Sequence, residues 1–433
     1  MKDLIRQFND LSRREFVTSA ARAFLGVNVL SLAGPGVAAA LAAPSRSRKK
    51  PTSKNVIYLY MAGGMSHLDT FDPKPQSETQ GPVEAIKTKA DGVLISEYLP
   101  GLATHMDKIA VIRSMFSTQG AHDQGQYFLH TSYIARGTIQ HPSLSSWVLN
   151  LSGRTNEQLP GNVLIGGAGR SVGAGFFETR FAPVVIGNPY AGLQHSRLPK
   201  GVDERRFRER LSLASRFDKA FQRRYDQQQV RAYTDMYDDA IGLMKSKDLE
   251  AFDINHEKPA LREAYGQNPF GQGCLLARRL VQKRVRFVEV TLGGWDTHTD
   301  NFVNTSRLSA TLDQALSTLL TDLESKGLLD QTLVVVATEF GRTPVINENN
   351  GRDHHNKAFA CLLAGGGVKG GQAYGGTDPR GVEIEDNEVT IPDFNATIIE
   401  AIGLPLHKVI HSPEGRPFTV AHKGKPIEAL LGG

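Results

Sequence analysis

The sequence predicts an α/β fold in which a mostly parallel sheet is buried between layers of helices. Short apolar runs rich in β-branched residues recur along the chain without a polar face, which is typical of parallel strands covered on both sides. Helical patterns with one apolar stripe separate several of these runs. At 433 residues, of which 40% are hydrophobic and 22% charged, the chain is long enough to bury such a core.

Six apolar runs account for the predicted strands. They are NVIYLYM (55–61), KIAVIR (108–113), APVVIG (182–187), VRFVEVTL (285–292), TLVVVAT (332–338) and AFACLLAG (358–365). Each run is short and apolar on both faces, so each is predicted to form one strand of a single sheet covered by helices.

Three helices are predicted around the later strands, at residues 271–284, 306–327 and 393–403. The apolar stripe of the second helix is formed by Leu308, Leu312, Leu316, Leu319 and Leu323. Gly327 suits the position just past the end of this helix. Asp393 is predicted as the N-cap of the third helix, and Gly403 is predicted to end it.

Residues 201–265 differ in composition from the rest of the chain. They are dense in charge, yet they keep apolar residues at helical spacing: Phe207, Leu211, Ala214, Phe217, Phe221 and Tyr225. This pattern predicts a helical insertion at about 201–265 within a domain that spans 55–433. Its arginine-rich face is either a binding surface or, in the simpler interpretation, a solvated helix face.

The N-terminus has the build of a twin-arginine export signal. Arg13 and Arg14 lie within SRREFV (12–17), and an uncharged stretch follows from residue 23 to 44. Small side chains predict cleavage after Ala42, which makes residues 1–42 the signal peptide. A periplasmic or extracellular location and a transient contact with the Tat translocon are therefore expected.

The alternative for this segment is a membrane anchor that is never cleaved. Gly34, Pro35 and Gly36 interrupt the apolar stretch, and its core is shorter than the roughly 20 residues that a membrane span needs. Residues 43–54 follow as a basic linker. The twin-arginine route carries folded proteins, often with a metal or cofactor already bound, so this address favours a metal site.

Charge and cysteine content exclude several classes of protein. The net charge of +5 is small for this length, so a nucleic-acid partner is not expected. Cys274 and Cys361 lack the spacing of a zinc ribbon or a thioredoxin-like site. They are expected to be two buried thiols or, alternatively, one disulfide.

Polar clusters follow three of the predicted strands. These are AGGMSHLDTFDPKP (62–75), GGWDTH (293–298) and EFGRTPVINENNGRDHH (339–355). Because functional groups of a parallel sheet gather at the carboxyl ends of its strands, the three clusters are expected to lie close together in space.

Asp296 and His298 are the strongest metal candidates. They are two residues apart, so in an extended segment both side chains point to one side. An imidazole with a carboxylate suits zinc, manganese or iron. The alternative is a hydrogen-bonded structural pair. Glu339 and His354 at neighbouring strand ends favour the metal, and of the adjacent His354 and His355 only one is expected to ligate.

Arg342 and Arg352 flank the same segment. A planar guanidinium matches phosphate, sulfate or carboxylate, so both are candidates for binding an anionic substrate. The alternative is ion pairing with Asp353 or Glu339.

Several ordered motifs carry a resemblance to a known family. They are GGMSHLDTFDPKP (63–75), HPSLSSWV (141–148), GGWDTHTDN (293–301), LVVVATEFGRTPVIN (333–347), GRDHH (351–355), LLAGGGVKGGQAYGGTD (362–378) and DFNATIIEAIGL (393–404). Together they resemble the bacterial family called domain of unknown function 1501. That family is exported, often by twin-arginine signals, and is placed beside sulfatases and phosphodiesterases. The resemblance implies a three-layer alkaline phosphatase-like sheet flanked by helices, but a fold alone does not fix a function.

The chain departs from that superfamily at its metal and nucleophile positions. Glu339 and Phe340 replace an expected Asp-His pair, and Asp69 would have to serve for the metal-binding Asp that normally follows the first strand. Residues 120–133 resemble the nucleophile helix of sulfatases, yet no Ser, Thr or Cys stands near His122. A one-metal site is therefore expected rather than a two-metal site with an alkoxide nucleophile.

The resulting expectation is an exported hydrolase of a phosphate or sulfate ester that uses a metal-activated water. Its expected ligands to a divalent ion (zinc, manganese or calcium) are Asp296, His298, His354 and Asp69. Glu339 would act as a ligand or base and His122 would transfer protons, while Arg342 or Arg352 would hold the ester oxygens. The substrate would be a small-molecule or polysaccharide ester. The alternative is a non-catalytic envelope or extracellular binding protein with a degenerate fold of this kind, and the oligomeric state is left open.

Overall fold

A computed structural model describes residues 53–167, 172–194, 196, 203, 205–213 and 241–432. The chain divides into two units, residues 1–49 and residues 50–433. The predicted signal peptide, most of the basic linker and much of the predicted insertion lie outside the described residues. Within those ranges, no helix is both long and apolar enough to cross a membrane.

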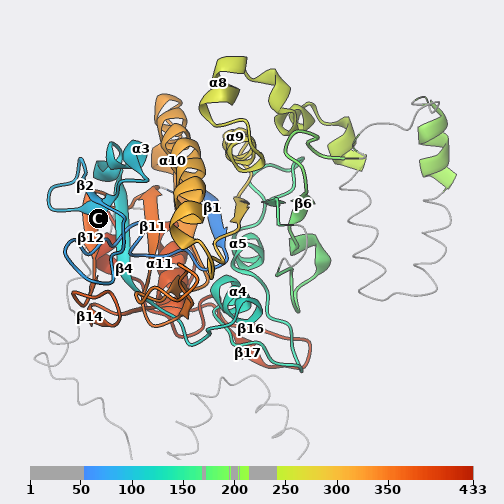
Figure 1. Ribbon diagram of the computed structural model, residues 1–433. Helices are drawn as coiled ribbons and strands as arrows, with labels where there is room; N and C mark the ends of the chain where they lie inside the picture. Colours follow the sequence, from blue (N-terminus) through green and yellow to red (C-terminus); the bar gives the residue numbers. More distant parts are fainter. Residues whose placement is uncertain are drawn as a thin grey trace, which may run out of the picture. The chain divides into compact units, whose positions relative to one another are not determined.

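The second unit is built on one large sheet (Figure 1). In the described ranges it has nine strands, in the order β12 (Gln372–Tyr374), β4 (Ile109–Phe116), β11 (Phe359–Gly365), β8 (Thr332–Ala337), β1 (Asn55–Ala62), β7 (Phe287–Gly293), β5 (Asn162–Ile165) and β6 (Val184–Ile186), with β15 (Val389–Thr390) also on β4. Of these strands, β11 alone runs antiparallel to its neighbours β4 and β8. The predicted mostly parallel sheet is confirmed.

Side chains of successive strand residues divide between the two faces of the sheet, as the period of two requires. In β1, Ile57, Leu59 and Met61 belong to one apolar cluster, whereas Val56 and Tyr58 belong to the other. Helices α3 (Pro100–Ala103), α9 (Pro269–Gln282) and α10 (Asn301–Ser325) contribute to the first cluster, and α4 (His122–Thr131), α5 (Leu144–Ser152) and α11 (Ile391–Ala401) contribute to the second.

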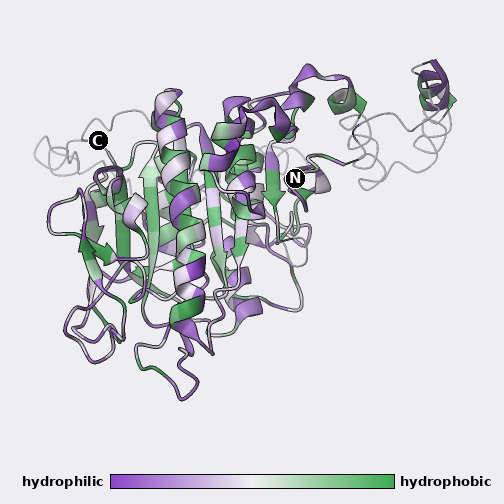
Figure 2. Ribbon diagram, turned by 45° about the horizontal axis from the view of Figure 1, so that its top comes forward, coloured by the Kyte–Doolittle hydropathy of each residue, from purple (hydrophilic) through white to green (hydrophobic). Residues whose placement is uncertain are grey.

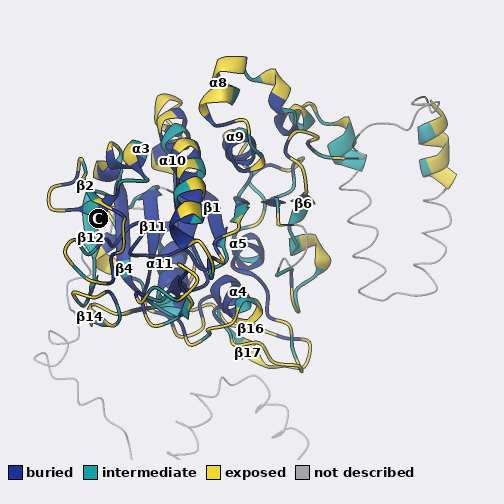
Figure 3. Cartoon of the chain, viewed as in Figure 1, coloured by how far each residue is buried: buried dark blue, intermediate teal, exposed yellow. Residues whose placement is uncertain are grey.

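The result is the three-layer α/β arrangement that the sequence predicts. Hydrophobic residues line the strands, and α10 carries polar residues on its outer face (Figure 2). The strands are the most deeply buried part of the unit (Figure 3). Burial on both faces explains why the strand sequences lack the polar alternation of an exposed sheet.

All six predicted strands are present, as are the three predicted helices. The positive φ of Gly327 and Gly403, just past α10 and α11, confirms the predicted helix ends. The N-cap of α11 was predicted wrongly, because Thr390 caps it and Asp393 is its partner in a capping box. Both cysteines are free and buried, which confirms the thiol interpretation.

Smaller elements complete the unit. Among the described residues, four two-stranded ribbons pair β2 (Ala85–Lys87) with β3 (Leu94–Ser96), β9 (Gly341–Arg342) with β10 (His354–His355), β13 (Gly376–Thr377) with β14 (Ile384–Asp386), and β16 (Ile410–His411) with β17 (Pro417–Phe418). The 3₁₀ helices are η1 (Met106–Lys108), η2 (Thr179–Phe181), η3 (Lys247–Phe252), η4 (Ile254–His256), η5 (Leu329–Gln331) and η6 (Glu428–Leu430). The described parts of the predicted insertion are largely helical, at 205–213, 241–245, η3, η4 and α8 (Pro259–Ala264).

Candidate functional site

One edge of the sheet collects the polar segments singled out in the sequence. The parallel strands β1, β7 and β8 end there, and α4 begins there after β4. Because β11 runs the other way, the segment that precedes it, including His354, arrives at the same edge. This topology brings together residues that are more than 200 positions apart in the chain.

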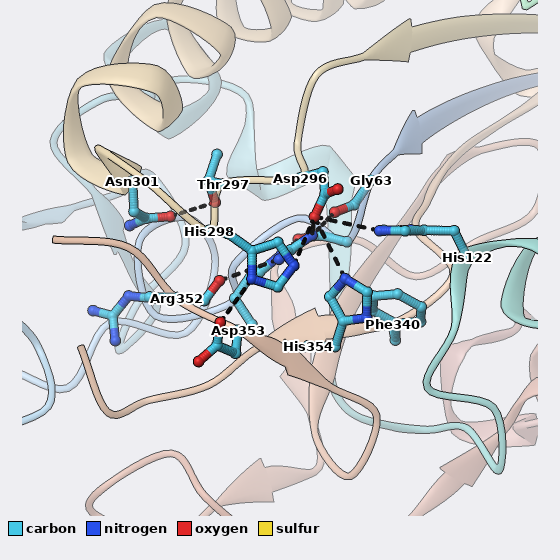
Figure 4. A network of polar contacts seen from close by, with 12 residues as sticks. Gly63, His122, Asp296, Thr297, His298, Asn301, Phe340, Arg352, Asp353 and His354 are labelled. Atoms are coloured by element: carbon cyan, nitrogen blue, oxygen red, sulfur yellow. Dashed lines mark hydrogen bonds and ion pairs between the residues drawn. The ribbon is translucent and has the colours of Figure 1, made fainter. Parts of the chain in front are cut away.

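The centre of this edge is the Asp296 carboxylate, with three imidazoles around it (Figure 4). Its Oδ1 lies 3.3 Å from Nε2 of His122, 3.2 Å from Nε2 of His298 and 3.4 Å from Nε2 of His354. The rings of His122 and His354 have their centroids 4.4 Å apart, and those of His298 and His354 lie 4.7 Å apart. We call these four residues the histidine cluster.

The other ring nitrogen of each histidine is held by an acceptor. Nδ1 of His122 lies 2.8 Å from Oε1 of Glu339, and Nδ1 of His298 lies 2.7 Å from Oδ1 of Asp353. Nδ1 of His354 lies 2.8 Å from the carbonyl oxygen of Gly120. Carbonyl and ionised carboxylate oxygens only accept hydrogen bonds, so each Nδ1 carries a hydrogen. A neutral ring then presents its Nε2 lone pair to Asp296, whereas a protonated ring donates to that carboxylate.

Where the rings are neutral, this arrangement sets lone pairs against a carboxylate, and a further cation would stabilise it. Nε2 of His122 and of His354 is buried and has no hydrogen-bond partner among the described residues, although both atoms lie within 3.4 Å of Asp296. One ligand atom from each of His122, Asp296 and His354 lies within 4.8 Å of the others, which is close enough for a single metal ion. Histidine ligands of metals commonly donate their second ring N–H to an oxygen, as His122, His298 and His354 do here.

The charges around the cluster keep Asp296 ionised. Burial alone would raise its pKa, but the hydrogen bond and charge of Arg342, together with His122 and His298, lower the pKa to about 2. The hydrogen bond that His122 donates to Glu339 raises the pKa of His122 despite its partial burial. Burial lowers the pKa of His354, which favours its neutral, ligating form. The cluster therefore combines a permanent carboxylate with at least one imidazole that resists protonation.

Arg342 contacts the histidine cluster from the protein interior and does not face a substrate. Its side chain is fully buried and its Nη2 lies 2.5 Å from Oδ1 of Asp296. The guanidinium also donates to the carbonyl oxygens of Gly63, Gly64 and Arg352. The expected role of Arg342 in holding ester oxygens is thus not supported, because its donors are already bonded within the protein.

Asp69 and Arg352 form a separate buried ion pair. Neither side chain is exposed, and Nε of Arg352 lies 2.8 Å from Oδ2 of Asp69, which also accepts from Asn301 at 2.8 Å. The remaining donors of Arg352 go to carbonyl oxygens of Thr343, Pro344, Thr79 and Gln80. The expectations of Asp69 as a metal ligand and of Arg352 as a substrate contact are therefore wrong, because each neutralises the other inside the protein.

Glu339 lies behind His122 instead of beside a substrate. It is 1% exposed, and its Oε1 accepts from the backbone N–H of Gly63 at 2.9 Å as well as from His122. Its Oε2 accepts from the Tyr60 hydroxyl at 3.1 Å. The carboxylate thus orients His122 and is not placed as the ligand or base that the sequence suggested.

Two glycines allow the segments of the site to touch. At Gly63, with φ of +120°, an added Cβ would lie 2.5 Å from the backbone nitrogen of Asp296. At Gly351, an added Cβ would lie 1.9 Å from the carbonyl oxygen of His298. A side chain at either position would push apart the two loops that carry the cluster.

Other site residues carried no recognisable signal in the sequence. The Phe340 ring packs 4.9 Å from the His122 ring and 4.7 Å from the His354 ring, forming an apolar wall. Asp353 was considered only as a partner for an arginine, and the carbonyl of Gly120 has no sequence signature. His355 turns away from the cluster and bonds the carbonyl oxygen of Val382 at 2.8 Å, so only one of the adjacent histidines reaches Asp296.

Comparison with known proteins adds little beyond architecture. No curated protein matches the chain. Similar solved structures include the lipoteichoic acid synthase LtaP from Listeria monocytogenes (9% identity, 82% of this chain and 74% of that chain, TM-score 0.39). Others are the PsFucS1 sulfatase from Pseudoalteromonas sp. (12%, 82% and 68%, 0.36) and a protein in the alkaline phosphatase superfamily from Vibrio parahaemolyticus (12%, 82% and 68%, 0.38).

These similarities are distant. With identities near 10% and TM-scores below 0.5, nothing about the site or the reaction of this chain follows from them. Residues 53–431 match the model of a family whose description is protein of unknown function (DUF1501). The chain belongs to the DUF1501 family.

Proposed function

We propose that the chain is a hydrolase of a phosphate or sulfate ester whose metal ion is held by His122, Asp296 and His354. One observation carries the proposal: two buried Nε2 atoms without hydrogen-bond partners face an ionised carboxylate, while both Nδ1 atoms are held as donors. Such a set of lone pairs is stabilised by a cation.

The donor atoms favour some metals over others. Two imidazole nitrogens and one carboxylate oxygen suit zinc or manganese. Calcium, which the sequence left among the alternatives, prefers sites built wholly of oxygen ligands. A divalent ion with a single charged ligand keeps positive charge, so it attracts an anionic ester.

The roles of the histidines differ from those expected from the sequence. His298 is 45% exposed, and Asp353 holds its Nδ1, so its Nε2 is available to accept a proton. In our proposal His122 is a ligand and His298 transfers the proton, the reverse of the sequence-based assignment. Imidazole oriented by a carboxylate is a common general base.

The reaction that fits these roles is attack by water. The cluster contains no hydroxyl or thiol that could act as nucleophile. The oxygen of water forms a bond to phosphorus or sulfur, and its proton passes to Nε2 of His298. The bond to the ester oxygen then breaks, and the same imidazole returns the proton to the leaving alcohol. The metal ion would supply Lewis-acid polarisation and a lower pKa for water.

A binding protein without catalytic activity is the second candidate, and one observation favours it. Arg342 already places a cation 2.5 Å from Oδ1 of Asp296. A guanidinium in that position can replace a metal ion as the partner of the carboxylate. In that case the fold would retain the cluster as a structural or ligand-binding feature.

Hydrolysis assays separate the two candidates. Phosphate and sulfate monoesters and diesters should be screened with added zinc or manganese, using the wild-type chain, Asp296→Ala and the control Asp300→Asn. Asp300 is exposed in the same loop and has a left-handed backbone that Asn tolerates. The proposal predicts activity in the wild type and control and its loss in Asp296→Ala. No hydrolysis of any ester class by the wild type would favour the binding protein.

We also propose that residues 1–42 direct export by the twin-arginine route, on the basis of the sequence. Replacing both Arg13 and Arg14 by Lys should keep the precursor in the cytoplasm, as cell fractionation would show. Export of that variant at the wild-type level would contradict this proposal.

A further inference from the structure

A pocket of about 510 Å³ lies along α4, the helix that begins with His122. Its volume is in the usual range of small-molecule sites. The lining comes from α4, the segment around His141 and the glycine-rich segment before η2: Asp123, Gln126, Tyr127, Gln140, His141, Val172, Gly173, Ala174, Gly175, Phe177, Thr179 and Ala182.

The pocket adjoins the histidine cluster through this helix. His122 and Gln126 are four residues apart on α4, so they share one helix face with a rise of about 6 Å between them. Gln126 lines the pocket. A molecule with one end at His122 can therefore extend along α4 into the pocket.

His141 is a buried lining residue of the pocket, and its ring is held in one orientation. This residue is 3% exposed, and its ring stacks on Tyr133 at 4.5 Å with an interplanar angle of 5°. The Tyr127 hydroxyl accepts from the backbone N–H of His141 at 2.7 Å and lies 2.8 Å from Nδ1 of the same residue. In either neutral tautomer of His141, Nδ1 is paired with this hydroxyl and Nε2 is left to form one hydrogen bond, as donor or as acceptor.

The surroundings keep His141 neutral. Burial, together with the charge of Arg136, lowers its pKa to about 4. Nε2 has no hydrogen-bond partner among the described residues, and His141 lines the pocket. The pocket is thus lined by a neutral imidazole whose Nδ1 is paired with Tyr127.

The rest of the lining selects against charged ligands. No Lys or Arg is among the lining residues, and Asp123 is the one charged member. Phe177 offers an apolar face and is held by the Trp147 ring at 4.7 Å and the Phe176 ring at 5.0 Å. Among the described lining residues, an uncharged ring with hydroxyl groups would find both a hydrogen-bonding partner and an apolar surface.

We propose that this pocket is the subsite for the alcohol portion of the ester, and that it binds an uncharged, hydroxylated ring through a hydrogen bond at Nε2 of His141 and through the face of Phe177. The inference rests on the proposed function for the direction in which the ester lies. The anionic group would lie at the histidine cluster and the uncharged ring would lie beside it along α4.

Binding of uncharged probes tests the subsite without any hydrolysis. A panel of methyl hexopyranosides would be titrated by ligand-observed NMR against the wild type, His141→Phe, Thr179→Val and Asp296→Ala. His141→Phe keeps a ring to stack on Tyr133 but removes Nε2, so we expect affinity for a bound probe to fall about tenfold, the effect of one hydrogen bond. Thermal unfolding of each variant shows whether it is folded.

The outcomes are distinct. Binding that persists in Asp296→Ala but weakens in His141→Phe supports the subsite even if no ester is hydrolysed. If His141→Phe fails to fold, weaker binding by Thr179→Val, a change at another lining residue, carries the same conclusion. The proposal is overturned if no uncharged probe binds the wild type, or if probes bind all folded pocket variants equally. Hydrolysis without probe binding would overturn the subsite and leave the proposed function standing.

Discussion

In each histidine around Asp296, one ring nitrogen bonds a supporting group and the other faces the Asp296 carboxylate. Nδ1 is fixed by Glu339, Asp353 or the carbonyl of Gly120, and Nε2 faces the carboxylate. The support differs in burial, because Glu339 is 1% exposed whereas the Asp353 side chain is 56% exposed. This difference suits a fixed ligand at His122 and a proton-transferring group at His298.

The Glu339 carboxylate should be required for tight metal binding. In Glu339→Gln the acceptor of His122 becomes a neutral amide, so we expect metal affinity to fall about 10- to 100-fold, as for other supporting groups of metal ligands. Isothermal titration with zinc measures this. Glu348→Gln, an exposed change in the same loop, is the control and should bind as the wild type does. Equal affinity of Glu339→Gln and the control would contradict the supporting role.

At the scale of residues, the sequence predicts which side chains reach the sheet edge better than it predicts what they do there. Asp296, His298 and His354 follow or precede strands, and strand ends converge by topology. Burial is decided by tertiary packing, so nothing in the local sequence separates Arg342 and Arg352 from exposed arginines. For the same reason, the sequence did not predict that Asp69 pairs with Arg352.

The helix α4 is the element that joins the two halves of the proposed site. Its first residue, His122, belongs to the histidine cluster, and His130 near its end is buried against β7. Nε2 of His130 lies 3.1 Å from Oε1 of Glu289, and Nδ1 lies 2.8 Å from the carbonyl oxygen of Gln126. Both ring nitrogens face acceptors, which favours the doubly protonated ring.

Stability should therefore depend on pH through His130. Burial lowers its pKa, but the charge and hydrogen bond of Glu289 outweigh burial, so the pKa lies above the usual 6.5. A raised pKa stabilises the fold fully below about pH 6.5, and this contribution is lost as the pH rises through the folded-state pKa. The stability difference between wild type and His130→Gln should thus be larger near pH 6 than near pH 9.

Denaturant unfolding at the two pH values checks this. His105→Gln is the control, because burial lowers the pKa of His105 and its effect should have the opposite pH dependence. A pH-independent difference between wild type and His130→Gln would contradict the charged pair.

At the scale of elements, long apolar or amphipathic segments were predictable and short ones were not. All six predicted strands occur. The sequence did not predict β5 (Asn162–Ile165) or β12 (Gln372–Tyr374), because four and three residues are too few to show a pattern. The start of α11 was misplaced because Asp393 occurs in a capping box, in which the third helical residue resembles the cap itself.

Across the whole molecule, the Asp69–Arg352 pair joins segments that are far apart in sequence. Asp69 follows β1, Arg352 precedes β11, and Asn301 at the start of α10 donates to the same carboxylate. The pair lies between loops that come from three strands of the sheet. It should therefore be a requirement for folding rather than for chemistry.

Removing one partner should destabilise the protein strongly. Arg352→Met leaves a buried carboxylate without its cation, so we expect a loss of about 3–5 kcal/mol in the free energy of unfolding. The double variant Asp69→Asn with Arg352→Met should recover part of that loss. The control Arg380→Met breaks an exposed pair with Glu78 and should cost under about 1 kcal/mol. Similar losses for Arg352→Met and the control would show that the buried pair is unimportant.

Metal binding by the mature chain tests the central claim most directly. Elemental analysis after equilibration with zinc or manganese should find about one ion per chain in the wild type and in Asp300→Asn, and far less in Asp296→Ala and His354→Gln. Folded wild-type protein that stays free of metal, or Asp296→Ala that keeps the full amount, would contradict the account.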